Sequence, residues 1–404
     1  MTEARVLGDI GRLYQCRAEG PQGAVHPIDR AALVWSGDQI RWVGAEADLP
    51  DEFRAAPRES AWGRIVVPGL VDCHTHLAFA GWRADEFGQK LGGASYLDIA
   101  RAGGGILSTV AKTRAAEPAA LVERCLGFLG EMRSLGVTTV EAKSGYGLSL
   151  DAERRILEVY REVATRYDGT LVPTLLAAHT FPPEYRDDHR GYVDLVVDRI
   201  IPEVAGAGLA RFCDAFVEET AFSFEEGRRI LEAGKRHGLR PKLHADQITN
   251  GRGAELAAEV GAASADHLEQ VSPAGIDAMA RAGVVAVSLP IASLYLNVAP
   301  LRARPLIEAG VPVAVATDFN PGSAPSYHLP LAMMLACTLQ RMTPAEVLKG
   351  VTQVAARAIG LADRLGSLEA GRRADFVIVD AESVDHWMYY FRPNAAVRTV
   401  CGGR

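Results

Sequence analysis

The chain has 404 residues, enough for a large core and more than one domain, and its net charge of −7 leaves no basic footprint for nucleic acid or an anionic membrane surface. Its 48% apolar and 23% charged residues are typical of a globular protein, and no uncharged apolar run approaches the ~20 residues of a membrane helix. The first residues lack a basic segment followed by an apolar one, so we expect no signal peptide and a cytoplasmic protein. Six scattered cysteines without a Cys-x-x-Cys pair predict reduced thiols rather than a disulfide framework.

Both ends of the chain are predicted to contribute to one small β domain. Short strand-like runs with Gly and Pro punctuation occur near each terminus. We expect a small β-sandwich built from residues 1–67 and 361–404, with a catalytic domain, residues 68–360, inserted between them. The strand-like runs lie at 32–35, 40–43, 64–67, 374–380 and 397–401.

The central segment alternates short apolar, β-branched runs with amphipathic stretches. Eight such runs imply a parallel sheet, and the count matches an α/β fold of the (β/α)8 TIM-barrel type. A doubly wound open sheet is the alternative, which the lack of Gly-x-Gly-x-x-Gly after an early strand makes less favourable. The predicted strands are 70–73, 137–142, 171–178, 212–217, 242–245, 263–267, 284–289 and 313–317.

Local signals mark the helices between these strands. Asp151 and Ser223 are predicted N-caps, and Gly136, Gly238 and Gly310 stand where helices should end. The predicted helices are 120–135, 151–167, 223–237, 253–260, 272–282 and 301–309.

Two histidines close the first strand of the central segment. His74 and His76 follow the turn Pro68-Gly69 and an apolar run, and residues at i and i+2 of a strand point to the same face. Two neighbouring imidazoles can hold one metal ion. The pair alone is a weak signal, and its weight depends on further ligands downstream.

Further metal-ligating residue types end four of the later strands. His179 ends the third predicted strand, His244 the fifth, His267 the sixth and Asp318 the eighth. Barrel active sites are built at the C-terminal ends of the strands, so these side chains should converge. Imidazole and carboxylate suit zinc or iron, and an open coordination position supports hydrolysis. The two histidines of the first strand with His244 and Asp318 would form such a site.

Several longer runs make the pattern more specific. They are Asp72-Cys-His-Thr-His76, Arg83-Ala-Asp-Glu-Phe87, Ile99-Ala-Arg-Ala-Gly-Gly-Gly-Ile106, Glu141-Ala-Lys-Ser-Gly-Tyr-Gly147, His244-Ala-Asp-Gln247 and Ala316-Thr-Asp-Phe-Asn-Pro-Gly-Ser323. With the Pro-Gly-x-x-Asp-x-His-x-His strand, the chain resembles the amidohydrolase superfamily over essentially its whole length. Within it, the chain resembles the branch that hydrolyses 4-imidazolone-5-propanoate to N-formimidoyl-L-glutamate in histidine degradation.

The resemblance implies a role for each strand-end residue. His74, His76, His244 and Asp318 would bind one Zn²⁺ or Fe²⁺/Fe³⁺ per subunit, because metal coordination activates water at neutral pH. Asp318 would also take the proton from the attacking water. His267 would hydrogen-bond that water or stabilise negative charge on the carbonyl oxygen.

The resemblance also implies a set of substrate contacts. The planar guanidinium of Arg83 suits the propanoate carboxylate of the substrate. The loop after Asp318 contains Gly and Pro, which let backbone groups approach a ligand closely. The remaining residues that the resemblance assigns to substrate binding are Tyr146, His179, Gln247, Asn320, Gly322 and Ser323.

Gln247 helps to separate the competing functions. Related cyclic deaminases place a glutamate at that position, three residues after the histidine, to move protons, whereas an amide only donates and accepts hydrogen bonds to a ring amide. A deaminase of a heterocyclic ring is therefore the less favoured alternative. An inactive barrel that scaffolds or binds is the other, and it would be expected to have lost ligands. Lys143 ends the second strand rather than the fourth, so a bridging lysine and a second metal are not expected.

The Gly-rich run 102–106 lacks the Lys-Ser/Thr of a phosphate loop. We interpret it as a loop over the barrel mouth, either a moving lid or an ordinary turn. The resemblance suggests a homodimer acting on a small molecule. The histidines interpreted as surface or structural are His26, His189, His237, His328 and His386.

Overall fold

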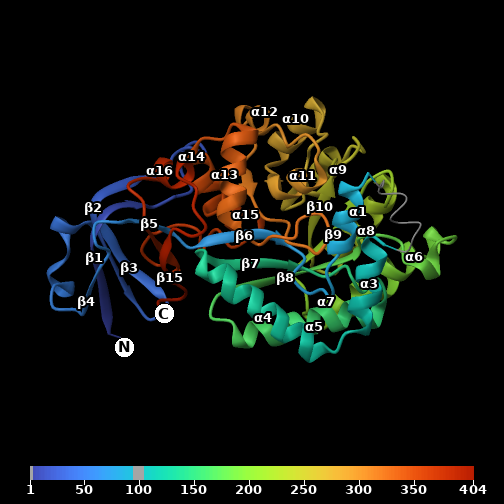
Figure 1. Cartoon of the computed structure of the whole chain (residues 1–404), viewed down its shortest axis with the longest axis horizontal. Coiled ribbons are helices and arrows are strands. Elements are labelled where there is room, and N and C mark those ends of the chain that lie inside the picture. Colours follow the sequence, from blue (N-terminus) through green and yellow to red (C-terminus); the bar gives the residue numbers. More distant parts are fainter. Residues whose placement is uncertain (1–2, 94–103) are drawn as a thin grey trace.

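The computed structural model describes residues 3–93 and 104–404, without the side chain of Lys90. Figure 1 shows a barrel of strands surrounded by helices, beside a smaller sheet at which both chain termini lie. The predicted α/β fold, a TIM barrel with a small β domain from both termini, is confirmed.

The barrel is one eight-stranded parallel sheet whose strands follow each other in chain order. Beyond its last strand, the chain returns to the first: Asp318 N–H donates to His74 O over 3.0 Å, and His76 N–H donates to Phe319 O over 2.8 Å. These bonds join the two outer strands of the sheet, which excludes the open doubly wound alternative. The strands are Leu70–Thr75 (β6), Val137–Lys143 (β7), Thr170–Ala178 (β8), Phe212–Val217 (β9), Arg240–Ala245 (β10), Ser264–His267 (β11), Val285–Ser288 (β12) and Val313–Val315 (β13).

Helices cover the outside of the barrel (Figure 1). The first ones are Ala84–Leu91 (α1), Ile106–Ala115 (α3), Pro118–Ser134 (α4), Leu150–Arg166 (α5), His189–Leu195 (α6), Ile201–Gly206 (α7), Phe224–Arg236 (α8) and Gly253–Val260 (α9). Those that follow are Pro273–Ala282 (α10), Pro290–Leu296 (α11), Ala303–Glu308 (α12), Leu329–Gln340 (α13), Pro344–Gly350 (α14), Gln353–Ala358 (α15) and Val384–Tyr389 (α16).

The helix boundaries agree with the local signals at all but one position. Ser223 is the N-cap of α8, as predicted, and it also forms a capping box with Glu226. The prediction that Asp151 is an N-cap is wrong: α5 begins one residue earlier, Ser149 with its extended backbone is the N-cap, and Asp151 lies in the first turn. An acidic residue there also favours the helix, because its charge faces the positive end of the helix dipole. The predicted glycine stops follow α4, α8 and α12 with positive φ.

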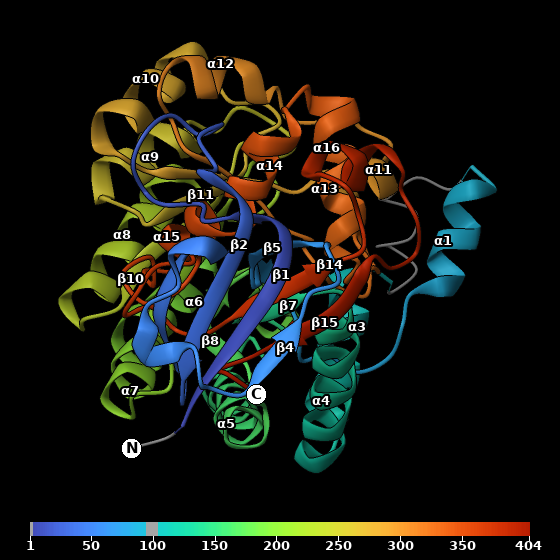
Figure 2. The same cartoon turned by 90° about the vertical axis from the view of Figure 1, so that its left-hand side faces the viewer.

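The two ends of the chain form a seven-stranded sheet, which faces the viewer in Figure 2. Strand β14 near the C-terminus pairs with β5 near the N-terminus, so that Val377 lies opposite Val67. One face packs around Trp35 and Phe376, whose rings meet edge to face at 5.3 Å. The strands are Ala4–Tyr14 (β1), Pro27–Ser36 (β2), Gln39–Ala45 (β3), Arg58–Ser60 (β4), Ile65–Pro68 (β5), Phe376–Val379 (β14) and Ala396–Val400 (β15).

Partly buried polar contacts join the terminal sheet and its connecting loop to the barrel. The Gln22 amide donates to Val313 O and accepts from Val313 N–H at 2.6 and 2.8 Å, at the start of β13. Lys349 on α14 donates to Glu19 O over 3.0 Å.

All six cysteines belong to the described part of the chain and are free thiols, in line with expectation. None of the described helices has the length and apolar character needed to cross a membrane.

Candidate metal centre and substrate site

The predicted metal ligands meet at one end of the barrel. His74 lies on β6 and His76 directly follows it, His244 lies on β10, and Asp318 follows β13. Each of the three histidines places a ring nitrogen within 4.8 Å of the others, and all four side chains are buried. Asp318 Oδ1 lies 3.3 Å from the Nε2 atoms of both His74 and His76. The sequence placed these four residues at strand ends, and the barrel brings them together.

Two buried aspartates orient two of the histidines. His74 Nδ1 lies 2.7 Å from Asp266 Oδ2, and His244 Nδ1 lies 3.1 Å from Asp214 Oδ2. Because an ionised carboxylate only accepts hydrogen bonds, each Nδ1 carries the proton and each Nε2 lone pair stays free. Burial lowers the pKa of His244 to about 3, against the opposing effect of Asp214. A neutral imidazole is the form that binds a metal.

The donor set fits a zinc or iron ion. The Nε2 atoms of His74 and His244 are buried without a hydrogen-bond partner among the described residues, and His76 Nε2 faces Asp318 Oδ1. Leaving such atoms unpaired is unfavourable in a folded protein unless a ligand satisfies them. Three imidazole nitrogens and one carboxylate are the donors that these metals accept in hydrolytic sites.

The barrel interior next to the histidines holds charged residues that the sequence analysis did not predict as part of the site. Lys143 Nζ donates to Glu141 Oε1 over 2.9 Å and to Asp214 Oδ2 over 2.8 Å, and it lies 3.5 Å from Asp266 Oδ2. Lys242 Nζ donates to Cys73 O over 3.2 Å and lies 3.7 Å from Asp266 Oδ2. All of these side chains are buried.

A signal for this network was present in the sequence. Lys242 precedes His244 by two residues, and Glu141 precedes Lys143 by two, so each pair shares one face of its strand. A charged residue inside an apolar strand requires a partner when that face is buried. The strand periodicity therefore pointed to a buried ion network, although not to the partner of each group.

His267 lies beside the four predicted ligands. Its ring centroid is 5.4 Å from that of His244, and His74, His267 and Asp318 also place ligand atoms within 4.8 Å of one another. His267 Nδ1 faces Glu269 Oε2 at 3.8 Å, too far for a hydrogen bond. Burial opposes the charged form of His267, but Glu269 and Asp318 outweigh it and raise the pKa. Both His267 and Asp318 have positive φ, 79° and 55°, a strained backbone typical of functional sites.

Tyr146 and His179 form an aromatic wall against His76. The His179 ring stacks on His76 with centroids 4.9 Å apart, and Tyr146 lies 5.5 Å from His179. His179 Nδ1 lies 3.1 Å from Gly145 O. Burial and the neighbouring His76 and His244 keep the pKa of His179 well below its usual value. Burial raises the pKa of Tyr146, which Arg83 opposes, so the phenol stays protonated at neutral pH.

The side chain of Asn320 shapes the loop after Asp318, and this loop packs against Arg83 at Gly322. The Asn320 amide donates to Asp318 O and Ser323 Oγ at 2.7 and 3.0 Å, and its oxygen accepts from the N–H groups of Gly322 and Ser323, both at 2.8 Å. This amide therefore shapes the loop with all of its hydrogen-bonding groups. A direct substrate contact from the Asn320 side chain would have to replace one of these bonds.

Gln247 lies half-buried in the turn after β10. The buried Glu218 holds the two residues after Gln247, since it accepts from Ile248 N–H over 2.8 Å and contacts the N–H and hydroxyl of Thr249.

The Gly-rich run 102–106 was interpreted as a loop over the barrel mouth. Its residues 102 and 103 lie outside the described part, while Gly105 N–H donates to Glu86 Oε1 over 2.8 Å and precedes α3.

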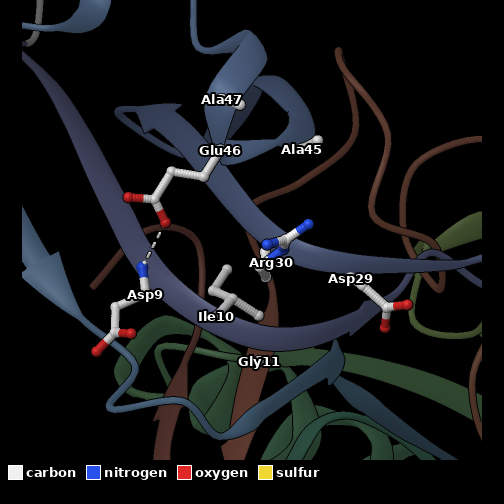
Figure 3. Close-up of a pocket in the computed structure, with 8 residues that line it drawn as sticks. All are labelled: Asp9, Ile10, Gly11, Asp29, Arg30, Ala45, Glu46 and Ala47. Carbon is white, nitrogen blue, oxygen red and sulfur yellow. Dashed lines mark hydrogen bonds between the residues drawn. The ribbon is translucent and has the colours of Figure 1, made fainter.

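A separate hollow lies on the terminal sheet (Figure 3). It has a volume of about 480 Å³ and is lined by residues of β1, β2, the end of β3 and the short 3-10 helix that follows, among them Asp9, Arg30 and Glu46. Glu46 Oε2 accepts from Asp9 N–H over 2.8 Å, as Figure 3 shows. The predicted site residues do not line it, so it is distinct from the metal centre.

Sequence comparisons agree with the geometry. The profile of the amidohydrolase family matches residues 65–404. A protein from Cupriavidus necator named imidazolonepropionase is 48% identical over 98% of this chain and 95% of its own length. Proteins of the same name from Shouchella clausii and Geobacillus kaustophilus are 47% and 49% identical, over 93% of this chain and 85% and 90% of their own.

Solved structures share the fold at low sequence identity. Atrazine chlorohydrolase from Arthrobacter aurescens, complexed with zinc, has a TM-score of 0.75 at 19% identity and covers 99% of this chain and 94% of its own. The 5-methylcytosine deaminase of Klebsiella pneumoniae has a TM-score of 0.74 at 18% identity, covering 99% and 96%. These likenesses bear on the fold alone.

Proposed function

The chain belongs to the amidohydrolase family, and we propose that it hydrolyses 4-imidazolone-5-propanoate to N-formimidoyl-L-glutamate, the imidazolonepropionase reaction of histidine degradation. The observation that carries this proposal is near-half identity over nearly the full length to proteins named imidazolonepropionase. The reaction adds water to the ring carbonyl and breaks the adjacent C–N bond. The carbonyl carbon becomes a carboxylate, and the ring nitrogen takes up a proton.

We infer that one zinc or iron ion binds to His74, His76, His244 and Asp318. When bound, such an ion supplies Lewis-acid chemistry, lowering the pKa of water to near 7. The unpaired imidazole nitrogens support this ligand set. Asp266 and Asp214 hold the histidine rings so that the free nitrogens converge.

Asp318 is the proposed proton carrier. Burial raises the pKa of Asp318, but the neighbouring imidazoles of His74, His76 and His267 outweigh this effect and keep the pKa well below its usual value, so the carboxylate is ionised at neutral pH. It would take the proton of the attacking water and pass it to the departing ring nitrogen. His267, which lies beside His74 and Asp318, would stabilise negative charge on the carbonyl oxygen.

The proposed substrate contacts lie beside this cluster. Arg83 would bind the propanoate carboxylate, because its nearest carboxylate, Glu86, is 4.0 Å from Nε and leaves the guanidinium incompletely paired. Tyr146 and His179 would contact the ring, and Gln247 would hydrogen-bond the ring amide. The loop residues Asn320, Gly322 and Ser323 would complete the pocket around substrate and product.

A deaminase of a heterocyclic ring is the second candidate, because it would use the same set of metal ligands. The purified protein is therefore incubated with 4-imidazolone-5-propanoate and, in parallel, with a panel of amino-substituted heterocycles. We expect the ultraviolet absorbance of the imidazolone to disappear without release of ammonia. Ammonia release from the heterocycles with a stable imidazolone spectrum would replace this proposal with the deaminase.

We also propose that the chain forms a homodimer in the cytoplasm. Exposed apolar side chains on α1 and α11, where Phe87 and Tyr295 meet with ring centroids 6.0 Å apart, support a protein contact. Light scattering of the purified protein measures the mass. A value near 43.3 kDa would identify a monomer and contradict the dimer.

A further inference from the structure

The loop between β7 and α5 encloses one buried carboxylate. Glu153, in the first turn of α5, is fully buried. Its Oε1 accepts from the N–H groups of Gly147 and Leu148, each over 2.8 Å, and its Oε2 accepts from Gly145 N–H over 3.1 Å. Three backbone amides of one loop thus point at a single side chain.

The loop backbone is built around this carboxylate. A Cβ at Gly147 would lie 2.5 Å from the backbone nitrogen and 2.8 Å from Oε1 of Glu153, so only glycine permits the approach. Leu148 has a φ of +51°, a conformation that L side chains rarely adopt, and Gly145 has a φ of +105°. Strain of this kind persists only when surrounding contacts enforce it, and the Glu153 carboxylate supplies three of them.

The same loop carries two groups of the substrate site. Tyr146 lies between two of the amides that Glu153 binds, and its ring is 5.9 Å from that of His76. The carbonyl of Gly145 lies 3.1 Å from His179 Nδ1 and can only accept, so it fixes the Nδ1–H form of that ring. One peptide segment therefore connects Glu153 with both Tyr146 and His179.

We propose that Glu153 is a positioning residue for substrate binding, which holds Tyr146 and His179 in the geometry that receives the substrate. This inference rests on the proposed function, because it takes those two residues as substrate contacts. Glu153 does not lie among the groups around the metal centre. Its loss should therefore weaken binding and leave the chemical step and the metal content nearly unchanged.

Glu153→Gln tests the proposal with a minimal change of shape. The amide oxygen can keep the bonds from Gly147 and Leu148, while the amide NH₂ then faces Gly145 N–H, donor against donor. We expect KM for 4-imidazolone-5-propanoate to rise about tenfold, the effect of one lost buried hydrogen bond, with kcat within about threefold of the wild type. Metal content by elemental analysis should equal that of the wild type.

Glu346→Gln is the matched control. Glu346 is a buried carboxylate of α14 that accepts from Thr343 N–H over 2.7 Å and pairs with Arg304 at 2.6 Å, remote from the metal centre. This variant should lower the Tm without changing KM. If Glu153→Gln also lowered only the Tm, the role of Glu153 would be structural and the proposal would be wrong.

Two further measurements keep the test independent of turnover and of the folding of one variant. Calorimetric binding of imidazole-4-propanoate, a ring with the same tail, should weaken about tenfold in Glu153→Gln, and hydrogen exchange of residues 144–149 should quicken. Gly147→Ala, which displaces the loop from the intact carboxylate, should have the same effect on KM. A wild-type protein that binds the probe but does not open the imidazolone ring would overturn the proposed function alone. Unchanged binding and exchange in both variants would overturn the positioning role.

Discussion

The guanidinium group of Arg83 lies where any side chain at position 322 would stand. A Cβ built on Gly322 would fall 1.1 Å from Nη2 and 2.0 Å from Cζ of Arg83. Arg83 Nε is buried without a hydrogen-bond partner among the described residues. Gly322 thus acts by leaving room for the guanidinium, and the guanidinium keeps hydrogen-bonding capacity for an anion.

Gly322→Ala should therefore displace Arg83. We expect KM to rise about tenfold or more with kcat little changed, because the binding of a carboxylate remote from the reacting bond is lost. Steady-state kinetics measure both constants. Gly127→Ala on α4 is the control, since an added Cβ there meets no atom within 4 Å, and it should leave both constants unchanged.

Two substitutions of Arg83 separate the effect of its shape on substrate binding from the effect of its charge. Arg83→Ala should raise KM more than Arg83→Lys, because lysine keeps the positive charge and loses only the bidentate fork. We expect the two variants to differ by about 1–3 kcal/mol in the free energy of substrate binding, the range of charge-assisted hydrogen bonds. Both variants should retain kcat near the wild-type value in the same assay. A fall in kcat at constant KM would contradict the role in binding the propanoate tail.

Asp318→Asn should abolish turnover, because the variant lacks both an anionic ligand and a base. The expected loss in kcat is at least about a hundredfold, the lower end of the contribution of a positioned acid–base group. Single-turnover kinetics with metal-saturated protein separate the loss of the base from the loss of the metal. A kcat within a few-fold of the wild type would refute the proposed proton carrier.

The aspartates behind the histidines should set the affinity for the metal. Asp214→Asn is expected to weaken binding of zinc roughly tenfold, because it removes the negative charge behind His244. Competition with a chelator measures this affinity, and chelation of the wild type should lower both activity and Tm reversibly. Asp375→Asn, a buried carboxylate next to Gly402 in the terminal sheet, should show the wild-type affinity.

The barrel and the convergence of the candidate metal ligands were predictable because their signals are local and periodic. Apolar runs with helical stretches between them predicted all eight strands, and the strand ends predicted that His74, His244 and Asp318 would meet. The two ends of the chain were also assigned correctly to one β domain. The N-cap of α5 was missed by two residues, since both Ser149 and Asp151 are suitable caps and only the backbone conformation decides between them.

The partners of individual side chains, whether near in the sequence or distant, were not predictable from a single sequence. Glu153 has the sequence position of an ordinary acidic residue in the first turn of a helix, yet its carboxylate accepts hydrogen bonds from the loop that precedes that helix. The partners of Lys143 and the approach of Arg83 to Gly322 depend on how far side chains reach across the barrel. Such relationships arise from tertiary packing, which no local pattern specifies.

The hydrogen bonds that join β6 to the segment after β13 have a consequence for biosynthesis. His74 and His76 leave the ribosome early, whereas Asp318, which donates its N–H to His74 O, follows after most of the barrel has been made. A nascent chain that ends before β13 therefore has an open sheet edge and an incomplete set of proposed ligands. Metal loading should wait for the last strand, and the ion would then join the first and last strands and oppose reopening of the sheet.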